Sequence, residues 1–167
     1  MRWLLVFIFI CCTRLVAQQQ AEPEKFVPGF TTGYAYLNSN SHFLQLGVLF
    51  GKDYGNIHLP SKGFGAGVEL SQVQGKFAAG TKAFLEYNGL LITAFRVNLI
   101  DYYSERKHDL RILPETGFTF FGKVSLTYGY GFPLMQTELL NIGRHRFALT
   151  INLIKSTHYT ANNRREN

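Results

Sequence analysis

The sequence predicts an all-β fold, a closed antiparallel up-and-down transmembrane β-barrel of about eight strands. Hydrophobic residues alternate with small or polar residues over most of the chain, and turn-forming residues interrupt this alternation about every ten to fifteen positions. Charged residues make up only 17% of the 167 residues, against roughly 25% in soluble globular domains, while 15% are aromatic. This length fits a single domain.

The charge balance gives little sign of a nucleic-acid partner. Lys and Arg outnumber Asp and Glu by 17 to 11, a formal net charge of +6. The excess is spread along the chain, apart from a short basic tail at Arg164 and Arg165, so it forms no basic patch of the kind that binds nucleic acid. No nucleic-acid partner is therefore expected.

Residues 1–17 are predicted to be a cleaved signal peptide. An apolar run of about ten residues follows Arg2, and Ala17 offers a small residue for cleavage. A membrane anchor would need about 20 apolar residues, and Arg14 interrupts the run too early for that. Residues 18–28 are polar with two prolines and are expected to form a leader. Both cysteines lie within the signal peptide, so the exported chain would be built without disulfides.

The barrel domain is expected to span residues 29–155, with a polar C-terminal tail at 156–167. Boundaries between strands come from turn residues such as Asn38-Ser39-Asn40 and Phe121-Gly122-Lys123. In chain order, the predicted strands are 29–38, 42–51, 63–72, 75–87, 89–102, 110–121, 123–132 and 145–155.

The two faces of the predicted strands carry different side chains: one face is bulky and nearly uncharged, and the other is small or polar. In the first strand Tyr34 and Tyr36 share a face, and in the fourth Gly80 and Lys82 lie on the small or polar face. Along the other strands, the bulky face carries Leu44, Leu46, Val48 and Phe50, then Phe64, Ala66, Val68 and Leu70, then Leu91, Thr93, Phe95, Val97 and Leu99, then Thr116, Phe118 and Phe120, then Val124, Leu126, Tyr128, Tyr130 and Phe132, and last Phe147, Leu149, Ile151 and Leu153. The alternate positions are small or polar, with Gly65, Gly67, Gly117, Gly129 and Thr150 as examples.

Two kinds of barrel fit this alternation, because either face could point outward. A water-soluble barrel of the lipocalin kind would enclose its bulky face, whereas a membrane barrel turns that face toward lipid. The interior of an eight-stranded barrel is only wide enough for its own side chains, which suits glycine and a few long charged residues. A water-facing surface would instead be rich in Lys and Glu and poor in glycine. The bulky face is therefore predicted to point outward, toward acyl chains.

Tyrosine and phenylalanine positions predict two aromatic belts at the two membrane interfaces, where a ring with a polar tip is favoured. One belt is expected from Tyr34, Tyr36, Tyr102, Tyr103, Tyr128 and Tyr130, and the other from Phe50, Tyr54 and Tyr87.

Three segments carry a likeness to a known group of proteins: Leu113–Phe118, Leu126–Pro133 and Arg146–Leu153. With the strand pattern around them, the chain resembles the small outer-membrane β-barrel proteins of Gram-negative bacteria, in the OmpA/OmpX-like size class. The resemblance implies location in the cell outer membrane, and contact with outer-membrane lipid, lipopolysaccharide and the barrel-assembly machinery. No cofactor and no bound metal are expected.

Charged residues on the polar face are predicted to form a network of salt bridges inside the lumen, because an ion in a narrow barrel must be paired. If the fifth and sixth strands pair around Glu105, Arg96 lies close to Glu115, and Lys82 is expected to pair with Glu69. The predicted network comprises Glu69, Lys82, Glu86, Arg96, Arg111 and Glu115. A structural plug is favoured over an ion path because the bore is narrow.

Three histidines, His42, His108 and His145, map to one rim of the predicted barrel. Ser39, Ser41, Ser104, Asp101 and Asp109 map to the same rim. A Ser, His and carboxylate arrangement there could serve a lipid hydrolase or acyltransferase. The spacing matches no nucleophile signature, so no catalytic residue is assigned.

The expected function is that of a non-enzymatic outer-membrane barrel with a structural or surface-interaction role. The connections 101–109 and 133–144 are expected to be extracellular and to make contact with an extracellular or envelope partner, because loops vary while the barrel supports them. A lipid-modifying enzyme and a soluble, lipocalin-like binder of an apolar ligand are the two alternatives.

Overall fold

The computed structural model describes residues 26–38, 41–54, 60–73, 75–89, 92–104, 107–135 and 142–154. The predicted signal peptide (1–17), most of the predicted leader (18–28) and the predicted tail (156–167) lie outside these residues.

All regular structure in the described residues is β-strand. The strands are β1 (Val27–Leu37), β2 (Ser41–Lys52), β3 (Ser61–Val73), β4 (Lys76–Asn88), β5 (Thr93–Ser104), β6 (Lys107–Phe120), β7 (Val124–Tyr130), β8 (Phe132–Pro133) and β9 (His145–Ile154). Across the same ranges, there is no helix with the length and hydropathy needed to cross a membrane.

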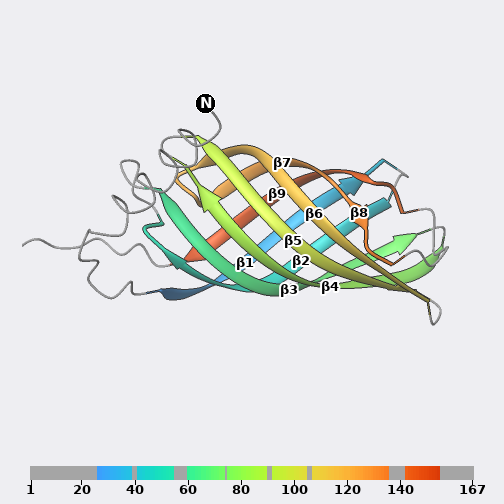
Figure 1. The fold of residues 1–167 in the computed structure, drawn as a ribbon. Coiled ribbons are helices and arrows are strands. Elements are labelled where there is room, and N and C mark those ends of the chain that lie inside the picture. The colour runs from blue at the N-terminus through green and yellow to red at the C-terminus, as the bar shows by residue number, and fades with distance from the viewer. Residues whose placement is uncertain are drawn as a thin grey trace, which may run out of the picture.

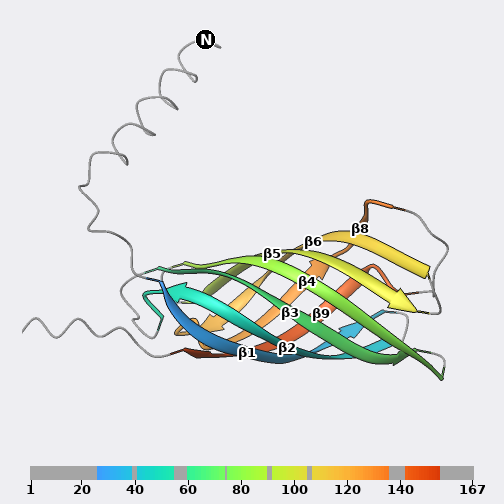
Figure 2. The same cartoon turned by 90° about the horizontal axis from the view of Figure 1, so that it is seen from below.

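The strands close into an antiparallel barrel, as Figures 1 and 2 show. Neighbours in sequence pair with each other from β1 to β6, β6 pairs with β7 and β8, and β9 pairs with both β7 and β1. The two-residue β8 continues the wall position of β7 after a break at Gly131. The wall therefore has eight positions, which confirms the predicted closed, up-and-down antiparallel barrel and its strand number.

The two ends of the barrel differ in their connections. The termini end holds the starts of β1, β3, β5 and β7, the ends of β2, β4, β6 and β9, and the turn 121–123. The loop end holds the ends of β1, β3, β5 and β8 and the starts of β2, β4, β6 and β9. The predicted connection 101–109 is wrong in extent. β5 continues to Ser104 and β6 begins at Lys107, because their ladder extends to the Ser104–Lys107 pair. Of the predicted loop 133–144, residues 136–141 lie outside the described ranges.

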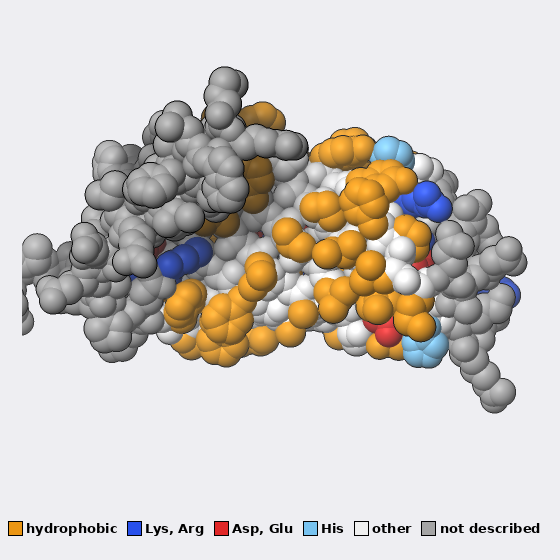
Figure 3. All heavy atoms as spheres, in the orientation of Figure 1, with side chains coloured by type: hydrophobic (Ala, Val, Ile, Leu, Met, Phe, Trp, Pro, Cys, Tyr) orange, Lys and Arg blue, Asp and Glu red, His pale blue; other side chains and the backbone are white. Residues whose placement is uncertain are grey.

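The bulky side chains point outward and the charged side chains point inward, which confirms the predicted orientation. Leu46 and Phe95 are 47% and 50% exposed, whereas Arg96, next to Phe95 in sequence, is 4% exposed. Figure 3 shows hydrophobic side chains spread over the middle of the visible face, with charged and histidine side chains toward the two ends. The soluble ligand-carrier alternative requires the opposite orientation.

Two apolar clusters fill the two ends of the lumen. At the loop end, Leu37, Phe43, Tyr102 and Ile142 belong to one cluster of buried residues; at the termini end, Leu49, Tyr54, Phe84 and Ile154 form the other. Tyr102 and Tyr54 are therefore buried in the lumen, and their assignment to the outward aromatic belts is wrong. The phase of the alternation explains Tyr102, which shares the inward face of β5 with Arg96 and Asn98.

A close approach between β6 and β7 requires glycine at position 117. A Cβ atom there would collide with the backbone oxygen of Leu126. We expect Gly117→Ala to lower the free energy of unfolding in detergent by about 1–3 kcal/mol, because the two strands must separate. Urea titration of the refolded protein measures this change.

Gly131→Ala is the matched control for this variant. A Cβ at position 131 would meet its nearest neighbour, Arg111 Cδ, at 3.4 Å, which is ordinary contact. The control should change stability by no more than about 0.5 kcal/mol. Equal losses from the two variants would contradict the close-approach explanation.

Candidate functional site

The lumen holds charged side chains of both signs in equal number. Among the described residues, four carboxylates and four cations are buried: Glu69, Glu86, Asp109 and Glu115 with Lys82, Arg96, Arg111 and Arg146. An unpaired ion in such a site costs several kcal/mol, so the balance of charges is a condition for closing the barrel.

Arg146 is the centre of the first ion cluster. From β9, its Nη1 and Nη2 donate to Glu69 Oε2 and Oε1 at 2.8 and 2.7 Å, and its Nε lies 2.9 Å from Glu115 Oε1. Lys82 Nζ lies 3.1 Å from Glu69 Oε1 and also donates to Gln45. The Tyr102 hydroxyl donates to Glu69 Oε2 at 3.2 Å. Side chains from five strands thus meet on Glu69 and Arg146.

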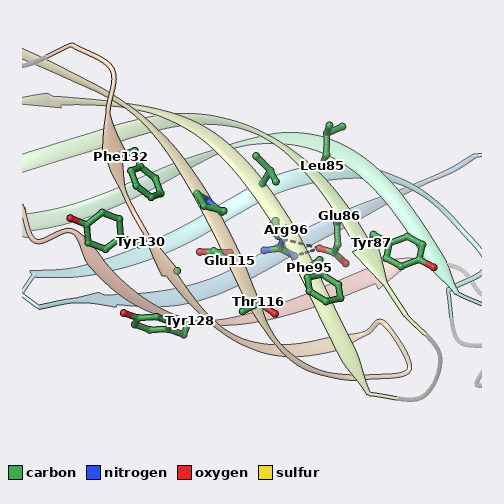
Figure 4. Close-up of a pocket in the computed structure, with 13 residues that line it drawn as sticks. Leu85, Glu86, Tyr87, Phe95, Arg96, Glu115, Thr116, Tyr128, Tyr130 and Phe132 are labelled. Atoms are coloured by element: carbon green, nitrogen blue, oxygen red, sulfur yellow. Dashed lines mark hydrogen bonds and ion pairs between the residues drawn. The ribbon is translucent and has the colours of Figure 1, made fainter. Parts of the chain in front are cut away.

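Glu86 and Arg96 form the second cluster, nearer the termini end. Arg96 Nε donates to Glu86 Oε2 at 2.9 Å, and its Nη2 contacts the same oxygen. Glu86 Oε1 accepts from three further groups, the Tyr54 hydroxyl and the amides of Asn88 and Asn152, at 2.8 to 2.9 Å. Figure 4 shows the Arg96–Glu86 pair, with dashed lines between the two side chains. Every donor on this carboxylate restrains its position.

Arg111 lies apart from these clusters, at the loop end. Its Nε donates to both oxygens of Asp109 at 3.0 Å. Its Nη1 and Nη2 donate to the backbone oxygens of Gly143 and Ile142 at 2.9 and 3.1 Å. Arg111 therefore ties the end of the 134–144 connection into the lumen, where Ile142 is buried.

The structure brings some of the predicted pairs together and separates others. Lys82 and Glu69 are in contact. Arg96 and Glu115 are partners in the β5–β6 ladder, as the predicted turn requires, but the ion pair of Arg96 is with Glu86 across the β4–β5 ladder. Glu115 instead lies against Arg146, a residue of β9 that is distant in sequence. The expected closeness of Arg96 and Glu115 is therefore confirmed by the register, but the ion pair that Arg96 forms is with Glu86.

Sequence reasoning missed Arg146, Asp109 and the two buried tyrosines as members of the network. Arg146 shares the phase of Ala148, Thr150 and Asn152 on the inward face of β9, so the alternation itself could have identified it. The preference of tyrosine for membrane interfaces predicts both rings in the belts, but this preference does not distinguish inward rings from outward rings.

The three histidines lie at the loop end but on three different strands, β2, β6 and β9, and all point outward. Each contacts a tyrosine: His42 Nδ1 bonds the Tyr34 hydroxyl, His145 Nδ1 lies 2.6 Å from Tyr128 Oη, and the His108 ring packs edge-on to Tyr103 at 4.8 Å. In the described part of the chain, no group of three His, Cys, Asp or Glu side chains could hold a metal ion.

The serines and aspartates of the predicted rim are divided between the two faces of the wall. Ser41, Ser104 and Asp109 are buried on the lumen side, whereas His42 and His108 point outward. Asp101 Oδ2 lies 3.5 Å from His108 Nδ1. Ser39 lies outside the described residues. The alternation therefore places Ser41 and Ser104 on the face opposite the histidines, which does not suit a Ser–His nucleophile.

The fold and the site together define a class of protein: a closed eight-stranded barrel with an apolar exterior and a lumen filled by balanced ion pairs. Comparisons with models of protein families, with curated proteins and with solved structures found no match.

A charge-reversal test separates the two possible partners of Arg96. Arg96→Glu should lower the free energy of unfolding in detergent by about 3–5 kcal/mol, because it places a third carboxylate beside Glu86 and Glu115. Adding Glu86→Arg should restore more stability than adding Glu115→Arg, since the observed ion pair is with Glu86. Urea unfolding of the three variants measures the difference.

Lys123→Glu is the control for charge reversal alone. Lys123 is exposed in the turn before β7, so its reversal should change stability by less than about 1 kcal/mol. Better rescue by Glu115→Arg than by Glu86→Arg would contradict the assigned pairing.

Tyr54 makes stability depend on alkaline pH. Burial, followed by the neighbouring Glu86 carboxylate, raises the pKa of the Tyr54 phenol well above its ordinary value of about 10. Above pH 10 the unfolded phenol ionises while the folded one stays neutral, so unfolding becomes easier by up to about 1.4 kcal/mol per pH unit. Tyr54→Phe should remove this part of the slope between pH 10 and 11. Equal slopes for the parent and the variant in urea titrations would count against it.

Proposed function

We propose that this protein is an outer-membrane β-barrel with a closed lumen and a structural or surface-interaction role. The observation that carries the proposal is the reversed polarity of the fold: the large apolar side chains cover the outside, and the ions lie inside. This arrangement is the reverse of a water-soluble domain and is what a hydrocarbon surrounding favours.

The outer surface is too apolar for water. Thirty large hydrophobic side chains are exposed in the described residues. Withdrawing one such side chain from water is worth about 1.5–3 kcal/mol, so even partial withdrawal of thirty amounts to tens of kcal/mol. Soluble monomers rarely expose continuous apolar patches of more than a few hundred Å². Lipid around the barrel would remove this cost.

Charges outside the lumen follow the same pattern. Lys52, Lys62 and Lys123 lie at the termini end, and Lys76 and Arg144 lie at the loop end. The wall between these two ends carries apolar side chains on its outward face. Such a distribution matches an apolar band bounded by two polar interfaces.

The filled lumen supports a scaffold rather than a wide channel. The lumen holds two clusters of buried apolar side chains and eight buried charged side chains. We propose the connection 133–144 for partner contact; Arg111 binds the carbonyls of Gly143 and Ile142, near its end. Together with the resemblance of the sequence to small outer-membrane barrels, this supports a location in the outer membrane of a Gram-negative cell. We propose that a cleaved signal peptide exports the protein, that the barrel-assembly machinery inserts it, and that phospholipid and lipopolysaccharide surround it.

Depth-dependent arginine substitutions test membrane insertion. Leu46 lies at the middle of β2 and Leu153 near the end of β9, and both point outward. In a membrane, Leu46→Arg should lower the free energy of unfolding in lipid vesicles by about 2–4 kcal/mol, and Leu153→Arg by only about 0–1 kcal/mol. The parent should also fractionate with membranes and show heat-modifiable migration in gels.

A water-soluble barrel gives a different result in the same experiment. Arginine at either exposed position would then be neutral or favourable, since it replaces an apolar group in contact with water. Equal, small effects of Leu46→Arg and Leu153→Arg, together with solubility of the parent without detergent, would overturn the proposal.

A further inference from the structure

The outward surface carries a groove between β4, β5, β6 and the β7–β8 wall position. Its volume is about 560 Å³, which is within the range of about 300–1,000 Å³ found for small-molecule sites. Figure 4 shows Tyr128, Tyr130 and Phe132 on one side of it, Leu85 and Phe95 on the other, and Thr116 between them. The groove therefore opens on the face that the proposed function assigns to lipid.

Small side chains on β6 make the groove. Thr116 is the ladder partner of Phe95 on β5 and of Tyr128 on β7, and it is shorter than both. Pro114 lies two positions away on the same outward face and partners Val97. Large rings thus stand on both sides of a low strand.

The wall is also interrupted at this place. Pro114 has no amide hydrogen to donate to a neighbouring strand. β6 pairs with β7 up to Glu115–Gly129 and with β8 at Ile112–Phe132, in the same register, and the pairing lapses between these points. The groove lies beside this gap in the ladder.

The loop end of the groove is polar, although its length is apolar. Arg144 is exposed, and its Nη1 donates to the hydroxyl of Tyr130 at 3.4 Å. The Tyr128 hydroxyl lies 2.6 Å from His145 Nδ1. A cation and two phenols therefore stand where the groove reaches the interface. This asymmetry matches an amphiphile with an anionic head and an apolar tail.

We propose that the groove binds an acyl chain of an anionic phospholipid, whose headgroup carries no cation to balance its phosphate, and that Arg144 holds the phosphate. Guanidinium groups bind phosphate through paired N–H donors, and the nearby phenols can donate further hydrogen bonds. The proposal rests on the membrane location given above, because only a barrel in a bilayer meets the lipid along its wall.

Tryptophan quenching by brominated lipids tests this site. The sequence has one tryptophan, Trp3, so Trp3→Phe gives a silent background in the full chain. Phe132→Trp reports from the groove, and Val48→Trp reports from the outward face of β2. Each is reconstituted in phosphatidylcholine vesicles containing brominated phosphatidylcholine or brominated phosphatidylglycerol. Relative quenching gives the preference for the anionic lipid at each position.

We expect the groove reporter to prefer phosphatidylglycerol by about fivefold over the zwitterionic phosphatidylcholine, since one basic residue near anionic lipid contributes about 1 kcal/mol. The β2 reporter should show no such preference. Arg144→Gln should reduce the groove preference to the β2 value, whereas Lys76→Gln, which removes one charge from the same end, should leave it unchanged. Thr116→Phe, which fills the groove, should also reduce it.

Three outcomes would overturn the proposal, and they are distinguishable. Equal preferences at both reporters would show an ordinary lipid-facing surface. Quenching at the β2 reporter without quenching by either lipid at the groove reporter would show that protein covers the groove, such as a second copy of this chain. Absence of quenching at both reporters would remove the membrane location itself, and with it the proposed function.

Discussion

Pairing of buried charges inside a narrow barrel is the constraint on which the rest of this structure depends. The eight buried ions come from β3, β4, β5, β6 and β9, and the two ion pairs of Arg146, with Glu69 on β3 and Glu115 on β6, join strands that are not neighbours, so they form only when the sheet curls into the barrel. Arg146 binds both Glu69 on β3 and Glu115 on β6, two strands that do not pair with each other. An unpaired ion in the lumen costs several kcal/mol. A sheet that stayed open or paired out of register would therefore lose the ion pairs as well as backbone hydrogen bonds.

The filled interior and the apolar exterior are two results of one alternation. Successive side chains of a strand point to opposite faces, so each inward ion on β4, such as Lys82 or Glu86, is followed by an outward residue such as Ala83 or Tyr87. A shift of register by one residue would bury the apolar set and expose the ions. The same constraint that fixes the lumen therefore fixes the surface that meets the surroundings.

Local irregularities create the features that could carry function. Pro114 and Thr116 lower one strip of an otherwise bulky wall, and the break at Gly131 separates β7 from β8 beside it. Between β8 and β9, Arg111 binds the carbonyls of Ile142 and Gly143 and so holds the chain before β9. The most specific surface thus lies where β-sheet regularity is lost.

The sequence by itself determined the fold class, the eight wall positions and the direction of each face, because period-two alternation and turn residues are local signals that survive without any partner. It also placed Lys82 beside Glu69, since consecutive strands must pair in register. Only the tertiary structure decided that Arg96 binds Glu86, that Glu115 and Glu69 meet on Arg146, and that Tyr54, in the turn after β2, points into the lumen. Glu86 and Glu115 are both ladder partners of Arg96, so side-chain reach decides between them, and the contacts of Arg146 depend on the packing of non-neighbouring strands across the bore. Neither has a periodic signature in the sequence.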